Sequence, residues 1–201
     1  MKRKWLLVLV LMGLSGPASA GPSDVEIIAT DAVTIGGMSQ GDDAWLSIGR
    51  EGPVVSRALV SFDLTRFRSN ARIARAWVML FRASAVGDSP MFVTAYRITQ
   101  GWSASTATWG NIAYAEAYDT TSIHWRDEAQ SPHYYWDVTE LAQAWIDGSL
   151  PNYGVMLIGH EEAGDNLRRF NSRNNWQGGE PRLLIDWAPI RRVYLPMVSS
   201  N

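Results

Sequence analysis

The stretch RAWVMLFR at residues 75–82 decides the expected fold, because it is apolar on both sides of an extended chain. In a strand, successive side chains point to opposite faces of the sheet. Trp77, Met79 and Phe81 would therefore face one side, and the intervening Val and Leu would face the other. A short continuous apolar run of this kind predicts a central strand that is covered on both faces.

Further apolar runs of strand length recur along the chain, separated by turns rich in Gly, Asp, Asn and Pro. Short strands at even spacing are typical of a sandwich or a barrel. We expect an all-β protein, and in the segment at 58–63 we expect Ala58, Val60 and Phe62 to form one buried face. The predicted strands cover residues 25–30, 44–48, 58–63, 75–82, 91–98, 134–137, 154–159, 167–172 and 182–187.

One helix is expected after the strand at 134–137. Thr139 is a suitable N-cap, Glu140 suits the first turn, and Gly148 can close the C-terminal end. Leu141 and Trp145 are four residues apart and share one face of such a helix. We expect that face to cover one end of the β-structure.

The two ends of the chain divide it into three parts. Residues 1–20 carry a basic start, an apolar run of about ten residues that is too short to span a bilayer, and an Ala-Ser-Ala cleavage site. Together these features are typical of a secretory signal peptide. Residues 21–187 would form a single domain, and residues 188–201 a separate C-terminal tail. No later segment is apolar enough to span a bilayer, so the mature protein is expected to be secreted or held at the cell surface.

Charge and cysteine content limit the classes of ligand and catalytic site that the chain can have. The chain has 18 Lys and Arg, three of them in the leader, so the remaining 15 cations face 20 carboxylates and the net charge is −5. No basic run indicates nucleic-acid binding. The chain has no cysteine, which excludes thiol catalysis and thiolate-bound metal sites.

No catalytic set is visible among the polar residues. The sequence has neither a G-x-S-x-G nucleophile turn nor an H-E-x-x-H zinc motif. Adjacent carboxylates are not a glycosidase signature, because neighbouring residues in a strand point to opposite faces. A glycosidase pair from distant segments stays open, but nothing in the sequence singles one out. A structural calcium ion is the better metal hypothesis, with Asp24, Glu26 and Asp186 as ligands from the first and last strands; ordinary surface carboxylates are the alternative.

The most ligand-like segment is GDNLRRFNSRNNWQGG at residues 164–179. Guanidinium groups make forked hydrogen bonds to carboxylates, amides can bond hydroxyls, and an indole can pack on the apolar face of a sugar. A long hairpin turn without a ligand is the alternative. The candidate binding residues are Arg168, Arg169, Asn171, Arg173, Asn175 and Trp176.

The order of several motifs resembles the DNRLRE domain family, which overlaps carbohydrate-binding module family 96 and is also described as disaggregatase-related. The resemblance extends over nearly all of residues 24–187 and depends on the joint order of the pieces. These pieces are RALVSFDLT (57–65), ARIARAWVMLFRA (71–83), VTAYRITQGWSASTATWGN (93–111), YYWDVTELAQAWIDG (134–148), NYGVMLIG (152–159), RFNSRN (169–174) and PRLLIDW (181–187).

The resemblance implies an antiparallel jelly-roll β-sandwich that binds polysaccharide, in some members an acidic one such as alginate. It also makes the loop at 97–111 a family feature, in which we expect Trp102 and Trp109 to pack inward and Thr106 and Thr108 to tie the turn by local hydrogen bonds. The leading hypothesis is a secreted, non-catalytic carbohydrate-binding or surface module for a uronate-rich polysaccharide. A structural or adhesive envelope protein is the second hypothesis, and a polysaccharide lyase or hydrolase is the third.

Overall fold

A computed structural model describes residues 23–37, 44–126 and 132–188. The expected leader at 1–20 lies outside the described residues, as does the expected tail except for Ala188. Eleven strands and one helix make up the described part. They are β1 (Ser23–Ile28), β2 (Asp31–Ile35), β3 (Trp45–Glu51), β4 (Val54–Ser61), β5 (Arg72–Val86), β6 (Met91–Ile98), β7 (Tyr114–Ile123), β8 (His133–Asp137), α1 (Thr139–Asp147), β9 (Val155–Ile158), β10 (Asn166–Asn171) and β11 (Arg182–Ala188).

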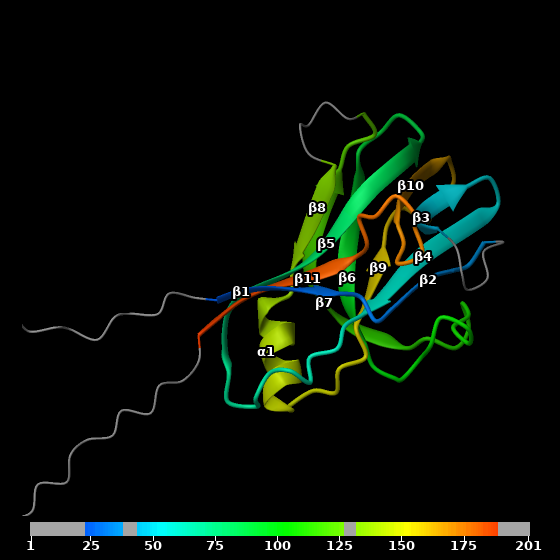
Figure 1. Ribbon diagram of the computed structural model, residues 1–201. Coiled ribbons are helices and arrows are strands. Elements are labelled where there is room, and N and C mark those ends of the chain that lie inside the picture. The colour runs from blue at the N-terminus through cyan, green and yellow to red at the C-terminus, as the bar shows by residue number, and fades with distance from the viewer. Residues whose placement is uncertain (1–22, 38–43, 127–131, 189–201) are drawn as a thin grey trace, which may run out of the picture.

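The strands form one curled antiparallel sheet in the order β1-β11-β5-β10-β3-β4-β9-β6-β7, with β2 beside β4 and β8 beside β5. The curl places β1, β11, β5 and β8 in one layer and β2, β4, β9, β6 and β7 in the other (Figure 1). The long β5 pairs with β11 through its first part and with β10 through its last part. β10 and β3 then continue the sheet from β5 to β4 in the other layer. The expected all-β sandwich with one short helix is confirmed.

The main core lies between the two layers. Ala58, Val60 and Phe62 point into it, as the alternation predicted, and they meet Val78 and Leu80 of β5 there. Trp136 of β8 is fully buried, and its indole N–H donates to the carbonyl of Val93 on β6, 2.8 Å away. On the outer face of β5, Trp77 and Phe81 are only half-buried, so this central strand is covered less completely than expected.

A second, smaller core lies on the outer face of the β2, β4, β9 and β6 layer. It contains the buried side chains of Val33, Ile35, Leu59, Ile98 and Met156. Residues of the loop after β6 pack over it. The sandwich therefore has an extra layer at this point, which is made by a loop and not by a sheet.

Helix α1 covers the end of the sandwich, as expected (Figure 1). Leu141 and Trp145 are buried on its inner face, and Gly148 closes it in the left-handed conformation at φ 80°. The start differs by one residue: Thr139 is the first helical residue, and its N–H donates to the Asp137 carboxylate at 2.9 Å. Thr139 Oγ1 instead accepts from the N–H of Ala76 on β5, which fixes the helix to the sheet. No helix among the described residues is long and apolar enough to cross a membrane.

Candidate functional site

The loop after β6 is fastened to the molecule by Trp102. Its indole N–H donates to the carbonyl of Tyr153 at 2.7 Å, and its ring packs against the second core. The carboxylate of Asp31, on β2, accepts the N–H of Ala104 at 3.0 Å. These contacts hold the loop against β2, and the inward packing expected for Trp102 is found.

Short hydrogen bonds shape the loop between its two tryptophans. Ser103 Oγ lies 2.8 Å from Thr106 Oγ1 and 3.2 Å from Ser105 Oγ. The side chain of Asn111 accepts the N–H of Thr108 at 2.7 Å and donates to the carbonyl of Thr106 at 2.8 Å. The side chain of Thr106 therefore makes the local hydrogen bond that was expected. Thr108 is held by its main-chain N–H and not by its side chain.

Trp109 does not pack inward as expected, since 43% of it is exposed. The guanidinium carbon of Arg57 lies 4.1 Å from the centroid of its ring, in a cation–π contact. Glu161 holds Arg57 in a forked pair, with Nε–Oε1 and Nη2–Oε2 distances of 2.5 and 2.9 Å, and this hydrogen bond raises the pKa of Arg57. Gly36, at φ 77°, lets the indole lie close to the main chain, because a Cβ there would be 2.8 Å from the ring and 2.1 Å from the carbonyl of Val55.

A groove of about 880 Å³ opens beside this loop. Its walls are β2 with Gly36 and Gly37, the segment 103–109, and Arg173 with Asn174. Arg173 is exposed, and it donates through Nη1 to the carbonyl of Thr30. The groove therefore combines an indole, several hydroxyl groups and a positioned guanidinium, which is a donor set that suits a sugar with an acidic group.

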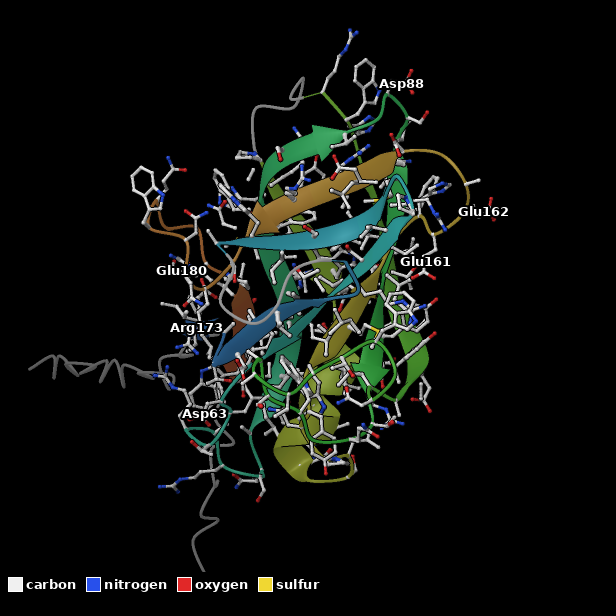
Figure 2. The ribbon with its side chains drawn as sticks, turned by 90° about the vertical axis from the view of Figure 1, so that its right-hand side faces the viewer. Asp63, Asp88, Glu161, Glu162, Arg173 and Glu180 are labelled. Atoms are coloured by element: carbon white, nitrogen blue, oxygen red, sulfur yellow. The ribbon has the colours of Figure 1, made fainter. Side chains whose placement is uncertain are left out.

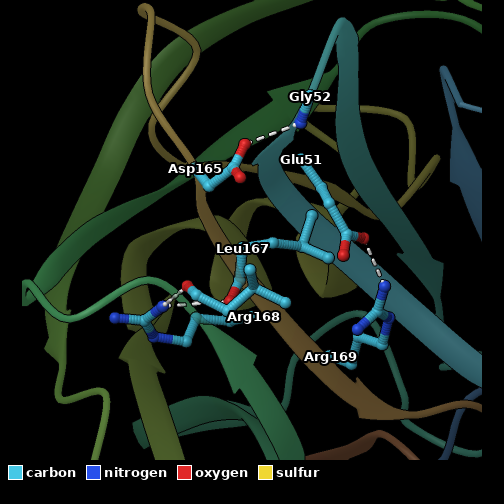
Figure 3. Close-up of polar contacts among 7 residues, drawn as sticks. Glu51, Gly52, Asp165, Leu167, Arg168 and Arg169 are labelled. Atoms are coloured by element: carbon cyan, nitrogen blue, oxygen red, sulfur yellow. Dashed lines mark hydrogen bonds and ion pairs between the residues drawn. The ribbon is translucent and has the colours of Figure 1, made fainter.

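Three of the six predicted binding residues lie on β10, and the two arginines among them have their charges already engaged (Figure 3). Arg168 is fully buried and donates to the carbonyls of Val86, Leu167 and Ser89 at 3.0, 2.9 and 2.5 Å. Arg169 is half-buried and pairs with Glu51 at 2.5 Å. Arg168 thus holds main-chain segments together, and it does not line the groove.

Two more of the predicted residues hold the 171–179 turn together. Asn171 Nδ2 donates to the carbonyl of Gly178 at 2.6 Å. Asn175 Nδ2 donates to the carbonyl of Ala44 at 3.0 Å, and its Oδ1 accepts the N–H of Gln177 at 2.9 Å. Both amides are buried, which matches the turn alternative for these positions.

The remaining two, Arg173 and Trp176, reach the surface. Arg173 lines the groove, and Trp176 is 84% exposed three residues further along the same turn. Figure 2 shows Arg173 on the same side of the molecule as Glu180. The turn therefore presents one cation and one indole to solvent.

The three candidate calcium ligands meet only in part. β1 and β11 pair with Asp24 opposite Asp186, whereas Glu26 forms an ion pair with Arg182 at 2.5 Å. Hydrogen bonding to Asp24, then burial and like charge, raise the pKa of Asp186. Within the described ranges no three acidic or histidine side chains form a group that could hold a metal ion.

Sequence reasoning did not place Trp109, Ser103 and Ser105 in a groove with Arg173. The available signal was the loop at 97–111 itself, with two indoles around a run of hydroxyls. Its partners, β2 and Arg173, are remote in sequence, so only the fold brings them together.

Comparison with known proteins gives one clear result. Among curated proteins the chain finds no match. The model of one family, carbohydrate-binding module family 96, matches residues 38–186, which is most of the chain and includes the loop after β6. The protein therefore belongs to carbohydrate-binding module family 96.

Proposed function

We propose that this protein is a secreted, non-catalytic module that binds a uronate-containing polysaccharide in the groove between β2, the 103–109 segment and Arg173. Family membership supports the carbohydrate ligand. The single observation that carries the acidic preference is that Arg173 and Trp109 line the same groove. A guanidinium offers paired donors to a carboxylate, and an indole offers a flat apolar surface to the ring.

Geometry around the two groups supports this assignment. Arg173 is anchored by one N–H to the carbonyl of Thr30, which leaves its other donors on the exposed side chain. The Trp109 ring is held by Arg57, so it is oriented before a ligand arrives. Preorganised groups lose little conformational entropy on binding.

Trp176 extends the proposed site for a long chain. It lies on the turn that begins beside Arg173, and its ring is almost fully exposed. A polymer that occupies the groove could continue over this indole. Trp176→Ala should then weaken retention of the polymer more than binding of a short oligosaccharide.

Affinity electrophoresis in alginate gels tests the proposal. Trp109→Ala and Arg173→Ala should each weaken retention by about tenfold, which corresponds to about 1.4 kcal/mol. Arg169→Ala is the matched control, because it removes the same charge from the half-buried pair with Glu51 outside the groove. Retention should remain close to that of the unchanged protein.

Three results would contradict the proposal. An equal loss in the Arg169→Ala variant would place the site on β10. Absence of binding to any polysaccharide would favour a structural or adhesive envelope protein. Release of unsaturated or reducing ends from alginate would show an enzyme. Secretion is tested separately, by sequencing the N-terminus of the mature protein, which should begin at Gly21.

A further inference from the structure

A second pocket, of about 390 Å³, lies away from the Arg173 turn. It is formed where β6 begins, where β9 ends and where β10 begins, and Phe92, His160, Glu162 and Asn166 are among the residues that line it. Figure 2 shows Glu161 and Glu162 on the opposite side of the molecule from Arg173. None of the residues that line this pocket lines the proposed uronate groove.

The cations near this pocket are already engaged with Glu161. Arg57 binds both carboxylate oxygens of Glu161, and Arg50 Nε donates to its main-chain carbonyl at 3.1 Å. Arg50 also donates to the carbonyl of Gly52 at 3.3 Å. These contacts fix the turn after β9 and leave no uncommitted guanidinium among the described residues that line the pocket.

Two other acceptors that line the pocket are, in contrast, unpaired within the described residues. Asn166 is only 9% exposed, and its Oδ1 has no hydrogen-bond partner within the described residues. A buried acceptor without a donor is unfavourable, so a turn of this side chain that brings its Oδ1 to a ligand donor would be favoured. Glu162 is exposed and forms no ion pair with any part of the chain that the structure describes. Glu162 is therefore the carboxylate of the lining that no cation neutralises within the described residues, while the His160 imidazole and the Asn166 amide can donate.

Apart from His160 and Glu161, its remaining lining is apolar. Phe92, which lines the pocket together with Glu162, is 68% exposed. At Gly159 a Cβ would lie 2.8 Å from Met91 Sδ and 2.9 Å from Ile48 Cγ2, so the main chain itself packs onto Met91 there. Apolar and aromatic side chains beside a small number of polar groups are the usual composition of a small-molecule site.

We propose that this pocket is a second binding site, for an amine-bearing sugar such as a glucosamine unit of a polymer. The ammonium group pairs with Glu162, and the apolar face of the ring packs on Phe92. A ligand N–H or O–H donates to Asn166 Oδ1 once that side chain turns toward the pocket. A pocket of this volume holds a pyranose ring with its substituents. The site goes beyond the proposed uronate groove and uses different residues.

Titration calorimetry with short glucosamine oligosaccharides tests this inference, at a pH where the amine is protonated. The glucosamine ligand should bind at least tenfold more tightly than the N-acetylated oligosaccharide of the same length. Glu162→Gln and Phe92→Ala should each weaken glucosamine binding by tenfold or more. Both side chains are exposed, so thermal melting should show that the variants remain folded.

Two controls separate this site from general charge attraction and from the uronate groove. Glu140→Gln removes one exposed carboxylate from helix α1 and should leave glucosamine binding unchanged. Arg173→Ala should also leave it unchanged. An equal loss in the Glu140→Gln variant, equal binding of the acetylated ligand, or no binding would overturn the inference. Tighter binding of a lysine oligopeptide with the same dependence on Glu162 would show a peptide site instead.

Discussion

At the scale of single residues, Arg168 shows how burial decides the role of a guanidinium. Its three main-chain acceptors are the carbonyls of Val86, Leu167 and Ser89. Burial, with a smaller contribution from nearby Arg82, lowers its pKa to about 10, so the side chain stays protonated at neutral pH. The sequence identified Arg168 as a cation with several donors. Its burial and its hydrogen-bond partners depend on strands that are far apart in the chain.

Arg168→Ala should therefore lower stability and leave uronate binding intact. The change leaves three carbonyls without this donor and opens a cavity, which should reduce the free energy of unfolding by about 3 kcal/mol or more. Urea denaturation followed by tryptophan fluorescence measures this loss. Arg169→Ala is the control: its half-exposed pair with Glu51 should contribute less than about 1 kcal/mol. A stable Arg168→Ala protein that no longer binds alginate would contradict the structural role.

The two tryptophans of the 97–111 loop should also separate stability from binding. Trp102→Ala removes the ring from the second core and the donor from Tyr153, so we expect it to cost about 2–4 kcal/mol of unfolding free energy. Trp109→Ala removes an exposed ring and a cation–π contact with Arg57, which should cost about 1 kcal/mol or less while alginate retention falls. Melting temperatures and gel retention measured on the same samples distinguish the two roles. Equal effects of both variants on stability would contradict this division.

At the scale of elements, the pairing of β1 with β11 produces a pH-sensitive contact between Asp24 and Asp186. Hydrogen bonding to Asp24 raises the pKa of Asp186 above its ordinary value of 3.8, so the folded protein holds a proton that the unfolded chain releases. The stabilisation is complete below that ordinary value and is lost as the pH rises through the raised pKa. At neutral pH the two carboxylates repel each other.

Asp186→Asn should consequently stabilise the protein at neutral pH and not at low pH. The difference in melting temperature between variant and unchanged protein should be near zero at about pH 3 and positive at about pH 7. Asp63→Asn is a control in which the change in stability at neutral pH should have the opposite sign. The N–H of Thr65 lowers the pKa of Asp63 and so stabilises its charged form. That variant should be less stable than the unchanged protein at neutral pH. A lower melting temperature for Asp186→Asn across this range would show that its carboxylate is needed in charged form.

The elements themselves were predictable where their burial pattern is strong. The nine strands expected from the sequence all overlap observed strands, and β6 agrees at both ends. β7 was missed because it is an edge strand of which only Ile123 is buried, so its alternation is hidden among polar residues. β2 was missed because its five residues follow closely after β1. They resemble a continuation of the β1 segment up to the turn at Gly36 and Gly37.

At the scale of the whole molecule, the groove depends on three segments that are remote in sequence. β2 supplies its floor, the loop after β6 supplies hydroxyls and Trp109, and the turn after β10 supplies Arg173. No local pattern encodes this meeting, because it follows from β2 pairing with β4 and from the second core that holds the loop down. The sequence located two of the contributing segments and could not place them side by side.

Arg57 connects this groove to the pocket beside β9. It contacts the ring of Trp109 at 4.1 Å on one side and the carboxylate of Glu161 at 2.5 Å on the other, so it positions one wall of each site. Arg57→Gln should therefore weaken alginate retention and glucosamine binding together, by about threefold to tenfold each, because neither Trp109 nor the Glu161 turn would be fixed. Arg169→Gln, which breaks the comparable pair with Glu51, should change neither affinity. If Arg57→Gln affects one ligand only, Arg57 supports a single site, and the two binding surfaces are mechanically independent.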